Sequence, residues 1–307
     1  MNKYSYLWKS VLLVVLALVL SACDNDNGAS KGPQYSVKSN DQEDKTYYLA
    51  IHPLHNPKKL IQAYQPLVNY LNKNIEDVNF KLESSRDYQA FEHKFRERHP
   101  EFILPNPWQT LEAMKVGYSV IAMAGDAQDF KGIFIVRKDS LITKITDLKG
   151  KTVSYPSHTA LAACIMPQYH LHERGIDVNK DINNNYVGSQ ESAIMNAYLK
   201  QSDVGVTWPP PWRLFQRDHP EEAAELTLVW ETAPLMNNSV MVRDDIPDVL
   251  GKRVQLLLMN LKNSPDGLAV LKNMSTSKFH QANDLSYAPV REFVKNFEAK
   301  VRPVEQK

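Results

Sequence analysis

The sequence has few cysteines, little net charge and no internal repeat, and each absence excludes a class of protein. Its 307 residues contain two cysteines and carry a formal net charge of +1 at pH 7. A charge this small gives no case for a nucleic-acid partner, because proteins that bind nucleic acids usually carry a basic patch. The absence of self-similarity at a fixed period argues against a solenoid.

Motifs for catalysis and for metal binding are also missing. The sequence has no glycine-rich phosphate loop and no Ser/His/Asp order. His52, His55 and His158 suggest a metal, but no second pair accompanies the His-x-x-His spacing. Cys164 is the one candidate nucleophile, and it lies in the apolar run "ALAACIM", where burial would raise the pKa of the thiol and make it unreactive. We therefore expect neither an enzyme nor a bound cofactor or metal.

The N-terminus carries the most specific signal. An apolar run from Val11 to Leu20 follows Lys3 and Lys9, and it is too short to span a bilayer comfortably. It ends in "LSAC", which resembles the lipobox of bacterial lipoproteins. We therefore predict a signal peptide over residues 1–22 and a lipid on Cys23; an ordinary signal peptide or an N-terminal anchor is the alternative. Two acyl chains suffice for stable membrane anchoring.

The segment 23–45 is polar and rich in turn-forming residues, which predicts a flexible tether. Asp24 follows the lipidated position and resembles the signal that retains lipoproteins on the inner membrane of enteric-type bacteria. We therefore expect the protein at the periplasmic face of the inner membrane. With Cys23 lipidated, only Cys164 remains, so no intramolecular disulfide can form. We expect a monomer that is stabilised by core packing.

The rest of the chain alternates between strand and helix patterns, which favours an α/β fold with a mainly parallel sheet. Its length leaves room for two domains, and 43% hydrophobic residues are typical of globular proteins. The runs 132–140 and 239–247 resemble each other, and we interpret them as two crossing hinge strands. The predicted lobes, with a ligand cleft between them, are 46–136 plus 240–307 and 137–239.

Three stretches resemble one family. They are "HPLHNPKKLIQAYQPLVNYLNK", "IVRKDS" with "ITDLKGKTV", and "GSQESAIMNAYLKQSDVGV". From Tyr47 to about Tyr287 the chain resembles the periplasmic phosphate/phosphite/phosphonate-binding proteins of ABC transporters. The resemblance implies a type II binding-protein fold, a small oxyanion as ligand and ABC permease subunits as partners. A sensory lipoprotein that acts on a membrane kinase would have the same fold.

The resemblance also places an anion loop at Ser157, His158 and Thr159, which precede a helix. Backbone N–H groups and the helix dipole favour an oxyanion there, although a simple N-cap is the alternative interpretation. Asp203 matches a family aspartate, whereas Gln190 stands where the family has histidine and Phe130 where it has tyrosine. We count all six residues as candidate ligand contacts.

Two tryptophan-containing stretches complete the candidate site. Asn106 and Trp108 in "LPNPWQ" follow a strand of the first lobe, and Trp208 in "TWPPPW" follows a strand of the second. Ligands bind at the carboxyl ends of strands in open α/β sheets. Two facing tryptophans would instead suit a cationic or aromatic solute, and packing against the neighbouring prolines is a further alternative.

Overall fold

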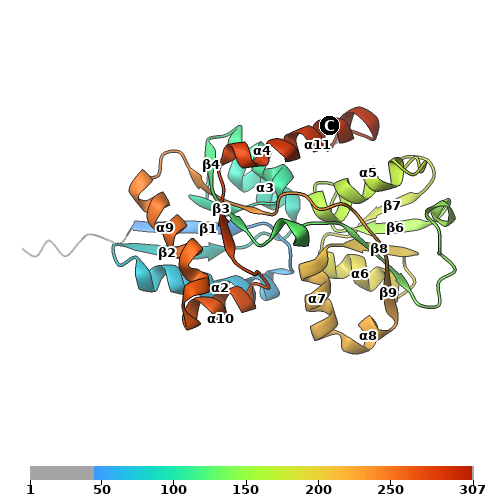
Figure 1. Cartoon of the computed structure of the whole chain (residues 1–307), viewed down its shortest axis with the longest axis horizontal. Helices are drawn as coiled ribbons and strands as arrows, with labels where there is room; N and C mark the ends of the chain where they lie inside the picture. The colour runs from blue at the N-terminus through green and yellow to red at the C-terminus, as the bar shows by residue number, and fades with distance from the viewer. Residues whose placement is uncertain (1–44, 306–307) are drawn as a thin grey trace, which may run out of the picture. The chain divides into compact units, whose positions relative to one another are not determined.

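A computed structural model describes residues 45–305. The predicted signal peptide, the predicted lipid site at Cys23 and the predicted tether except Lys45 lie outside the described residues. Within that range the chain folds into two α/β lobes that lie side by side (Figure 1). No helix in the described range is long and apolar enough to cross a membrane. The predicted fold class is confirmed.

The first lobe is built on a sheet of six strands, counted within residues 45–305. Their order is β11-β4-β10-β3-β1-β2. The parallel pairs are β1 with β2 and β1 with β3, while β10 and β11 run antiparallel to their neighbours. The strands are β1 (Lys45–Ile51), β2 (Val78–Glu83), β3 (Phe102–Leu104), β4 (Tyr118–Ala124), β10 (Ser239–Arg243) and β11 (Phe279–Gln281).

The second lobe is built on a sheet of five of the described strands, in the order β7-β6-β8-β5-β9. The parallel pairs are β6 with β7 and β6 with β8, and β5 runs antiparallel to β8 and β9. The strands are β5 (Ile133–Arg137), β6 (Thr152–Tyr155), β7 (Asn183–Tyr186), β8 (Val204–Thr207) and β9 (Leu226–Glu231).

Helices cover both sheets (Figure 1). In α2 the buried residues Leu60, Tyr64, Leu67, Val68 and Leu71 recur at helical spacing and pack into the core. The helices of the first lobe are α2 (Pro57–Asn74), α3 (Tyr88–Arg96), α4 (Pro107–Met114), α9 (Asp248–Asn260), α10 (Pro265–Asn273) and α11 (Ala288–Lys300). Those of the second are α5 (Met166–His172), α6 (Gln190–Tyr198), α7 (Pro209–Asp218) and α8 (Pro220–Ala224).

The two crossings between the lobes differ from those that we predicted. Strand β5 lies inside the second sheet and β10 inside the first, so neither is a crossing strand. The chain crosses in segments 125–132 and 232–238, where Thr232 and Leu235 donate backbone hydrogen bonds of 2.9 Å to the carbonyl oxygens of Gly132 and Phe130. The boundary expected after residue 136 is therefore wrong by one strand. The apolar run of β5 is buried because both faces of the strand are covered: Ile133 and Ile135 pack in one hydrophobic cluster, and Phe134 and Val136 pack in the other.

The C-terminal segment 240–307, which we assigned to the first lobe, also contacts the second. Helix α11 packs on α4 of the first lobe, but its ring of Phe293 lies 5.2 Å from that of Tyr169 in the second. Arg302 Nε donates to Gln168 Oε1 at 2.8 Å. The end of the chain thus joins the two lobes.

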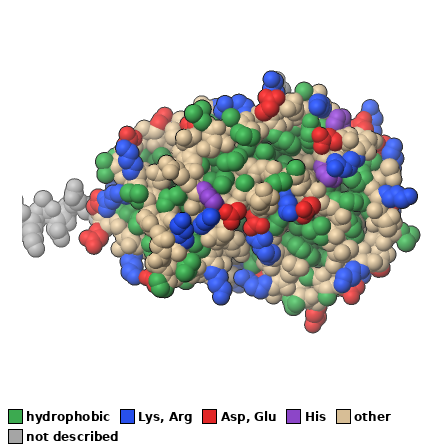
Figure 2. All heavy atoms as spheres, viewed as in Figure 1, with side chains coloured by type: hydrophobic (Ala, Val, Ile, Leu, Met, Phe, Trp, Pro, Cys, Tyr) green, Lys and Arg blue, Asp and Glu red, His purple; other side chains and the backbone are tan. Residues whose placement is uncertain are grey.

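Figure 2 shows acidic and basic side chains interspersed over the viewed face, in keeping with the small net charge.

Candidate ligand-binding site

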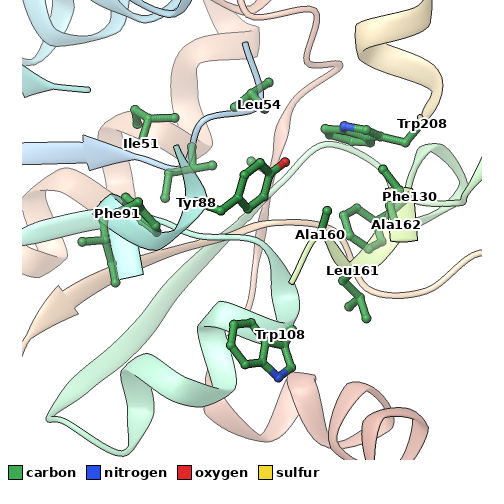
Figure 3. Close-up of a cluster of buried hydrophobic side chains, with 14 of the residues drawn as sticks. Ile51, Leu54, Tyr88, Phe91, Trp108, Phe130, Ala160, Leu161, Ala162 and Trp208 are labelled. Carbon is green, nitrogen blue, oxygen red and sulfur yellow. The ribbon is translucent and has the colours of Figure 1, made fainter. Parts of the chain in front are cut away.

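A small cavity lies where the two lobes and the two crossing segments meet. Its volume is about 10 Å³, close to the space that one water molecule requires. Figure 3 shows the ring of Tyr88 from the first lobe pointing toward Phe130, Ala160 and Trp208. The cavity is lined by His52, Tyr88, Asn106, Phe130, Ala160, Leu161, Ala162, Ala163, Gln190, Trp208 and Asn238.

A helix begins at the wall that the second lobe contributes. Ala160 is extended, and a π-helical turn over Leu161–Ile165 leads directly into α5. Within residues 45–305 the amide N–H groups of Leu161, Ala162 and Ala163 have no hydrogen-bond acceptor. These groups carry the positive end of the helix dipole and lie at the cavity. Leu161–Ala163 therefore form a row of backbone donors that suits an oxyanion.

Tyr88 and Gln190 meet across the cavity. Gln190 Nε2 donates to the hydroxyl oxygen of Tyr88 at 3.0 Å, and Gln190 Oε1 accepts from Thr207 Oγ1 at 2.8 Å. Because the Tyr88 oxygen accepts from Gln190, its own proton is available to a ligand. Burial raises the pKa of Tyr88, so the hydroxyl stays protonated.

His52 presents an acceptor to the same cavity. Its Nδ1 lies 2.9 Å from the carbonyl oxygen of Leu104, which can only accept, so Nδ1 carries the proton. Burial lowers the pKa of His52 to about 4, so the ring is neutral near pH 7. Its Nε2 is therefore unprotonated.

Two aromatic rings form the apolar wall of the cavity. The rings of Phe130 and Trp208 have centroids 5.5 Å apart, and both side chains are buried. Asn238 completes the lining with a side chain that is 3% exposed, and its Oδ1 has no hydrogen-bond partner among the described residues. Of the residues that line the cavity, none carries a carboxylate, an ammonium or a guanidinium group.

Polar contacts join the two lobes around the cavity. Thr159 Oγ1 donates to Glu92 Oε1 at 2.6 Å, and Asn106 Nδ2 donates to the carbonyl oxygen of Thr159 at 3.1 Å. Lys59 pairs with Glu191 at 3.1 Å and with Asp218 at 3.2 Å. The described structure is thus a closed arrangement of the two lobes.

The buried carboxylate of Glu92 makes stability depend on pH. Burial raises its pKa, and this shift is only partly opposed by the hydrogen bonds from Thr159 and Gln109. The folded chain therefore binds this proton more tightly than the unfolded chain does. We expect the free energy of unfolding to fall as pH rises from the ordinary carboxyl pKa of 4.5 to the raised value.

Glu92→Gln should remove that part of the pH dependence while keeping an acceptor for Thr159. Chemical denaturation of both proteins at about pH 4.5 and about pH 7.5 measures the slope. An unchanged slope in the variant would show that Glu92 is not responsible.

Four of the predicted contact residues line the cavity together: Phe130, Asn106, Gln190 and Trp208. The amide of Asn106 is already occupied, because its Oδ1 caps α4 by accepting from the backbone N–H of Trp108 at 3.0 Å. Trp108 itself lines a separate surface hollow between α4 and α11. The predicted pair of facing tryptophans is therefore wrong, since Pro107 starts a helix that turns Trp108 away.

The predicted hydroxyl-bearing loop lies beside the cavity rather than in its wall. Ser157 Oγ accepts from the backbone N–H of Thr159 at 3.2 Å, and Thr159 Oγ1 is bound to Glu92. The carbonyl oxygen of His158 accepts from Arg302 at 3.1 Å. The helix begins after these residues, so Leu161–Ala163 supply the free amides instead.

Asp203 lies far from the lobe interface, at the start of β8. Its Oδ2 accepts from the backbone N–H of Thr152 at 2.8 Å, and its Oδ1 pairs with Lys151 at 3.4 Å. It lines a different surface hollow of the second lobe. Asp203 therefore caps a turn, which is the usual role of a lone aspartate at the start of a strand.

Sequence reasoning missed three parts of the lining. His52 was weighed only as a metal ligand, and among the described residues no group of three or more His, Cys, Asp or Glu residues could hold a metal ion. Tyr88 and Asn238 were not identified. His52 directly follows β1 and Tyr88 follows the end of β2, so the rule that ligands lie at the carboxyl ends of strands could have found both.

Two α/β lobes that are joined by two crossing segments, with a small cavity between them, define a periplasmic binding protein of type II. Residues 49–287 match the model of a family described as "ABC transporter, phosphonate, periplasmic substrate-binding protein". The chain belongs to this family. Its members are substrate-binding proteins rather than enzymes, so the predictions of the family and of a non-enzyme are confirmed.

Two curated relatives are similar in sequence. The phosphonates-binding periplasmic protein of Escherichia coli is 21% identical over 173 residues, which cover 55% of this chain and 51% of that protein. A probable ABC transporter phosphite-binding protein of Prochlorococcus marinus is 21% identical over 186 residues, or 56% of this chain and 63% of that protein. The chain thus spans between half and two thirds of the length of these relatives.

Solved structures share the fold. A binding protein component of an ABC phosphonate transporter from Pseudomonas aeruginosa superposes with a TM-score of 0.78 at 16% identity, covering 84% of this chain and 88% of that one. The Prochlorococcus marinus protein in complex with methylphosphonate has a TM-score of 0.75 at 20% identity, covering 83% and 98%. At these identities the likeness shows the fold alone.

Proposed function

We propose that this chain is the substrate-binding component of an ABC importer and that it captures a small phosphorus oxyanion, such as phosphonate, phosphite or phosphate, between its lobes. The observation that carries the proposal is the row of free amides at Leu161–Ala163, which faces a small cavity. The names of the relatives, which are phosphonate- and phosphite-binding proteins, agree with this class of ligand.

Each wall of the cavity has a role in this proposal. The amides and the Tyr88 hydroxyl donate hydrogen bonds to the oxygens of the ligand, and charge is balanced by the helix dipole rather than by a side-chain cation. A methyl or hydrogen substituent on phosphorus packs against Phe130 and Trp208. A phosphonate is larger than the space of about 10 Å³, so the lobes must part to take it up. Because the ligand would then touch both lobes at once, its binding favours their closure over an open arrangement.

A cationic or aromatic solute fits this cavity less well. No carboxylate lines it among the described residues, so the charge of a buried cation would be left unpaired. The predicted tryptophan pair that favoured such a ligand is not formed, because Trp108 lies in another hollow. An oxyanion is the ligand class that the donors at the helix start suit.

The position in the cell is part of the proposal. Lipidation of Cys23 would anchor the chain to the periplasmic face of the inner membrane, and the tether 23–45 would let the two lobes reach the permease subunits. Support comes from the "LSAC" sequence and from the polar composition of the tether. The binding protein would act as a monomer that delivers its ligand to the permease.

Calorimetric titration of the purified full chain tests the ligand class. The panel is methylphosphonate, phosphite, phosphate and sulfate, with arginine as a cationic control. We expect at least one of the phosphorus oxyanions to bind with a dissociation constant in the micromolar range or below, about −8 kcal/mol or stronger. If none binds while arginine does, the proposed function is wrong.

A further inference from the structure

The cavity contains acceptors as well as donors, and a fully deprotonated oxyanion cannot satisfy both. The proton on His52 Nδ1 is fixed by the carbonyl oxygen of Leu104, so Nε2 offers only a lone pair. Asn238 adds Oδ1, which is buried and without a donor in the described part of the chain. His52, Asn238 and Leu161–Ala163 all line the same small cavity, so these two acceptors and the amide donors lie around one space of about 10 Å³.

Charge in the cavity adds a second constraint. No lysine or arginine among the described residues lines it, so the charge of a ligand is stabilised by dipoles alone. The cost of burying an ion rises with the square of its charge, and an oxyanion facing an acceptor also leaves that acceptor unpaired. A dianion is therefore disfavoured relative to a monoanion that keeps one hydroxyl group.

We infer that the cavity selects the singly protonated form of a phosphorus oxyanion, whose P–O–H group donates to Asn238 Oδ1, beside His52 Nε2, while its unprotonated oxygens accept from the amides of Leu161–Ala163. This inference rests on the proposed function. It makes Asn238 a residue that determines specificity. It also predicts discrimination against a sulfonate, which has the same tetrahedral shape and a single charge but no hydroxyl group.

Tyr88 and His55, the titratable groups next to His52, keep their protonation states over the pH range of the test. The ring of Tyr88 lies 6.1 Å from that of His52, and its pKa is raised by burial. His55 has a pKa lowered to about 3 and stays neutral above that pH. Burial raises the pKa of Glu92, and titration of that carboxyl would affect methylphosphonate and methanesulfonate alike.

An ammonium group could also donate to these acceptors, as in an aminoalkyl phosphonate. The cavity holds no carboxylate among the described residues to balance its charge, and the aromatic wall of Phe130 and Trp208 occupies the adjacent space. Burying an unpaired ammonium costs more than burying a hydroxyl donor. We therefore expect aminomethylphosphonate to bind more weakly than methylphosphonate.

The test compares methylphosphonate, methanesulfonate and aminomethylphosphonate by calorimetry on the full chain between about pH 5 and about pH 9. Methylphosphonate affinity should fall by about tenfold per pH unit above the second pKa of the ligand; that of phosphate esters is about 6. Methanesulfonate should bind roughly ten- to a hundredfold more weakly at the lowest pH, with a profile that follows no ligand titration.

Asn238→Ala should weaken methylphosphonate binding by about tenfold and leave methanesulfonate binding unchanged. Its Oδ1 accepts no hydrogen bond within residues 45–305, so the truncation leaves no donor to that oxygen unpaired. Asn273→Ala, on the exposed face of α10, is the matched control and should change neither ligand.

The outcomes separate the two proposals. Equal affinities for methylphosphonate and methanesulfonate, with equal pH profiles, would overturn the selection of the protonated form and leave the proposed function standing. Tighter binding of aminomethylphosphonate would also overturn it, in favour of an ammonium donor. If neither these ligands nor phosphite or phosphate bind, the proposed function fails and the inference fails with it.

Discussion

Leu161→Pro is expected to lower the affinity for methylphosphonate by roughly ten- to a hundredfold more than Leu161→Ala does. Proline removes the backbone N–H of residue 161, which is one of the three free amides at the cavity. A hydrogen bond to a charged group contributes about 1.5–3 kcal/mol, and the loss of one donor therefore gives an effect of this size. Calorimetry on both variants measures it.

The position tolerates proline for a local reason. Residue 161 is the first of its helix, where the N–H group has no intrahelical partner. Ala160 is extended, with φ −73° and ψ 101°, and a residue before proline prefers such a backbone. The helix should therefore persist in the variant.

Leu161→Ala is the matched control because it removes the same buried side chain and retains the N–H group. Both variants should lose similar amounts of stability in a denaturant titration. If they bind methylphosphonate equally well, the N–H group of residue 161 does not donate to the ligand. The proposed role of this amide would then be wrong.

Cys23→Ser is expected to move nearly all of the protein out of the membrane fraction, or to leave it unprocessed. The apolar run that ends in "LSAC" supports a lipid on this residue, and two acyl chains suffice for stable anchoring whereas one gives only marginal binding. Fractionation followed by mass spectrometry of the mature N-terminus measures both the location and the mass of the lipid.

Cys164→Ser serves as the control for loss of a cysteine. Cys164 is buried in the second lobe, so this variant should stay in the membrane fraction although its stability can change. Wild-type protein recovered in the soluble periplasmic extract would contradict lipidation. That result would not bear on the proposed ligand site, because the site is formed by the lobes, which follow the predicted tether.

The fold was predictable because periodic patterns decide the type of an element. In α2 the apolar residues recur every three or four positions, and Asn56 with Pro57 marks the start of the helix. Sheet membership was harder to predict. Strand β5 and strand β10 have similar sequences, "IFIVR" and "SVMVR", yet they lie in different sheets. Strand pairing is set by non-local contacts, which local similarity does not reveal.

The site was only partly predictable for a related reason. Gln190, Phe130 and Trp208 lie next to strand ends or crossings and were found. The hydroxyls of Ser157 and Thr159 attracted attention because such side chains usually bind anions, but here Thr159 donates to Glu92 across the lobes. Backbone amides carry no sequence signal of their own, so the role of Leu161–Ala163 followed only from the start of the helix.

A crystal structure of the full chain with methylphosphonate tests the central claim most directly. The account predicts that phosphonate oxygens lie about 2.7–3.2 Å from the amide nitrogens of Leu161–Ala163, with the methyl group against Phe130 and Trp208. It also predicts that a third oxygen lies within hydrogen-bond distance of Asn238 Oδ1. A phosphonate bound outside this cavity, for example at Asp203 on the far side of the second lobe, would contradict it.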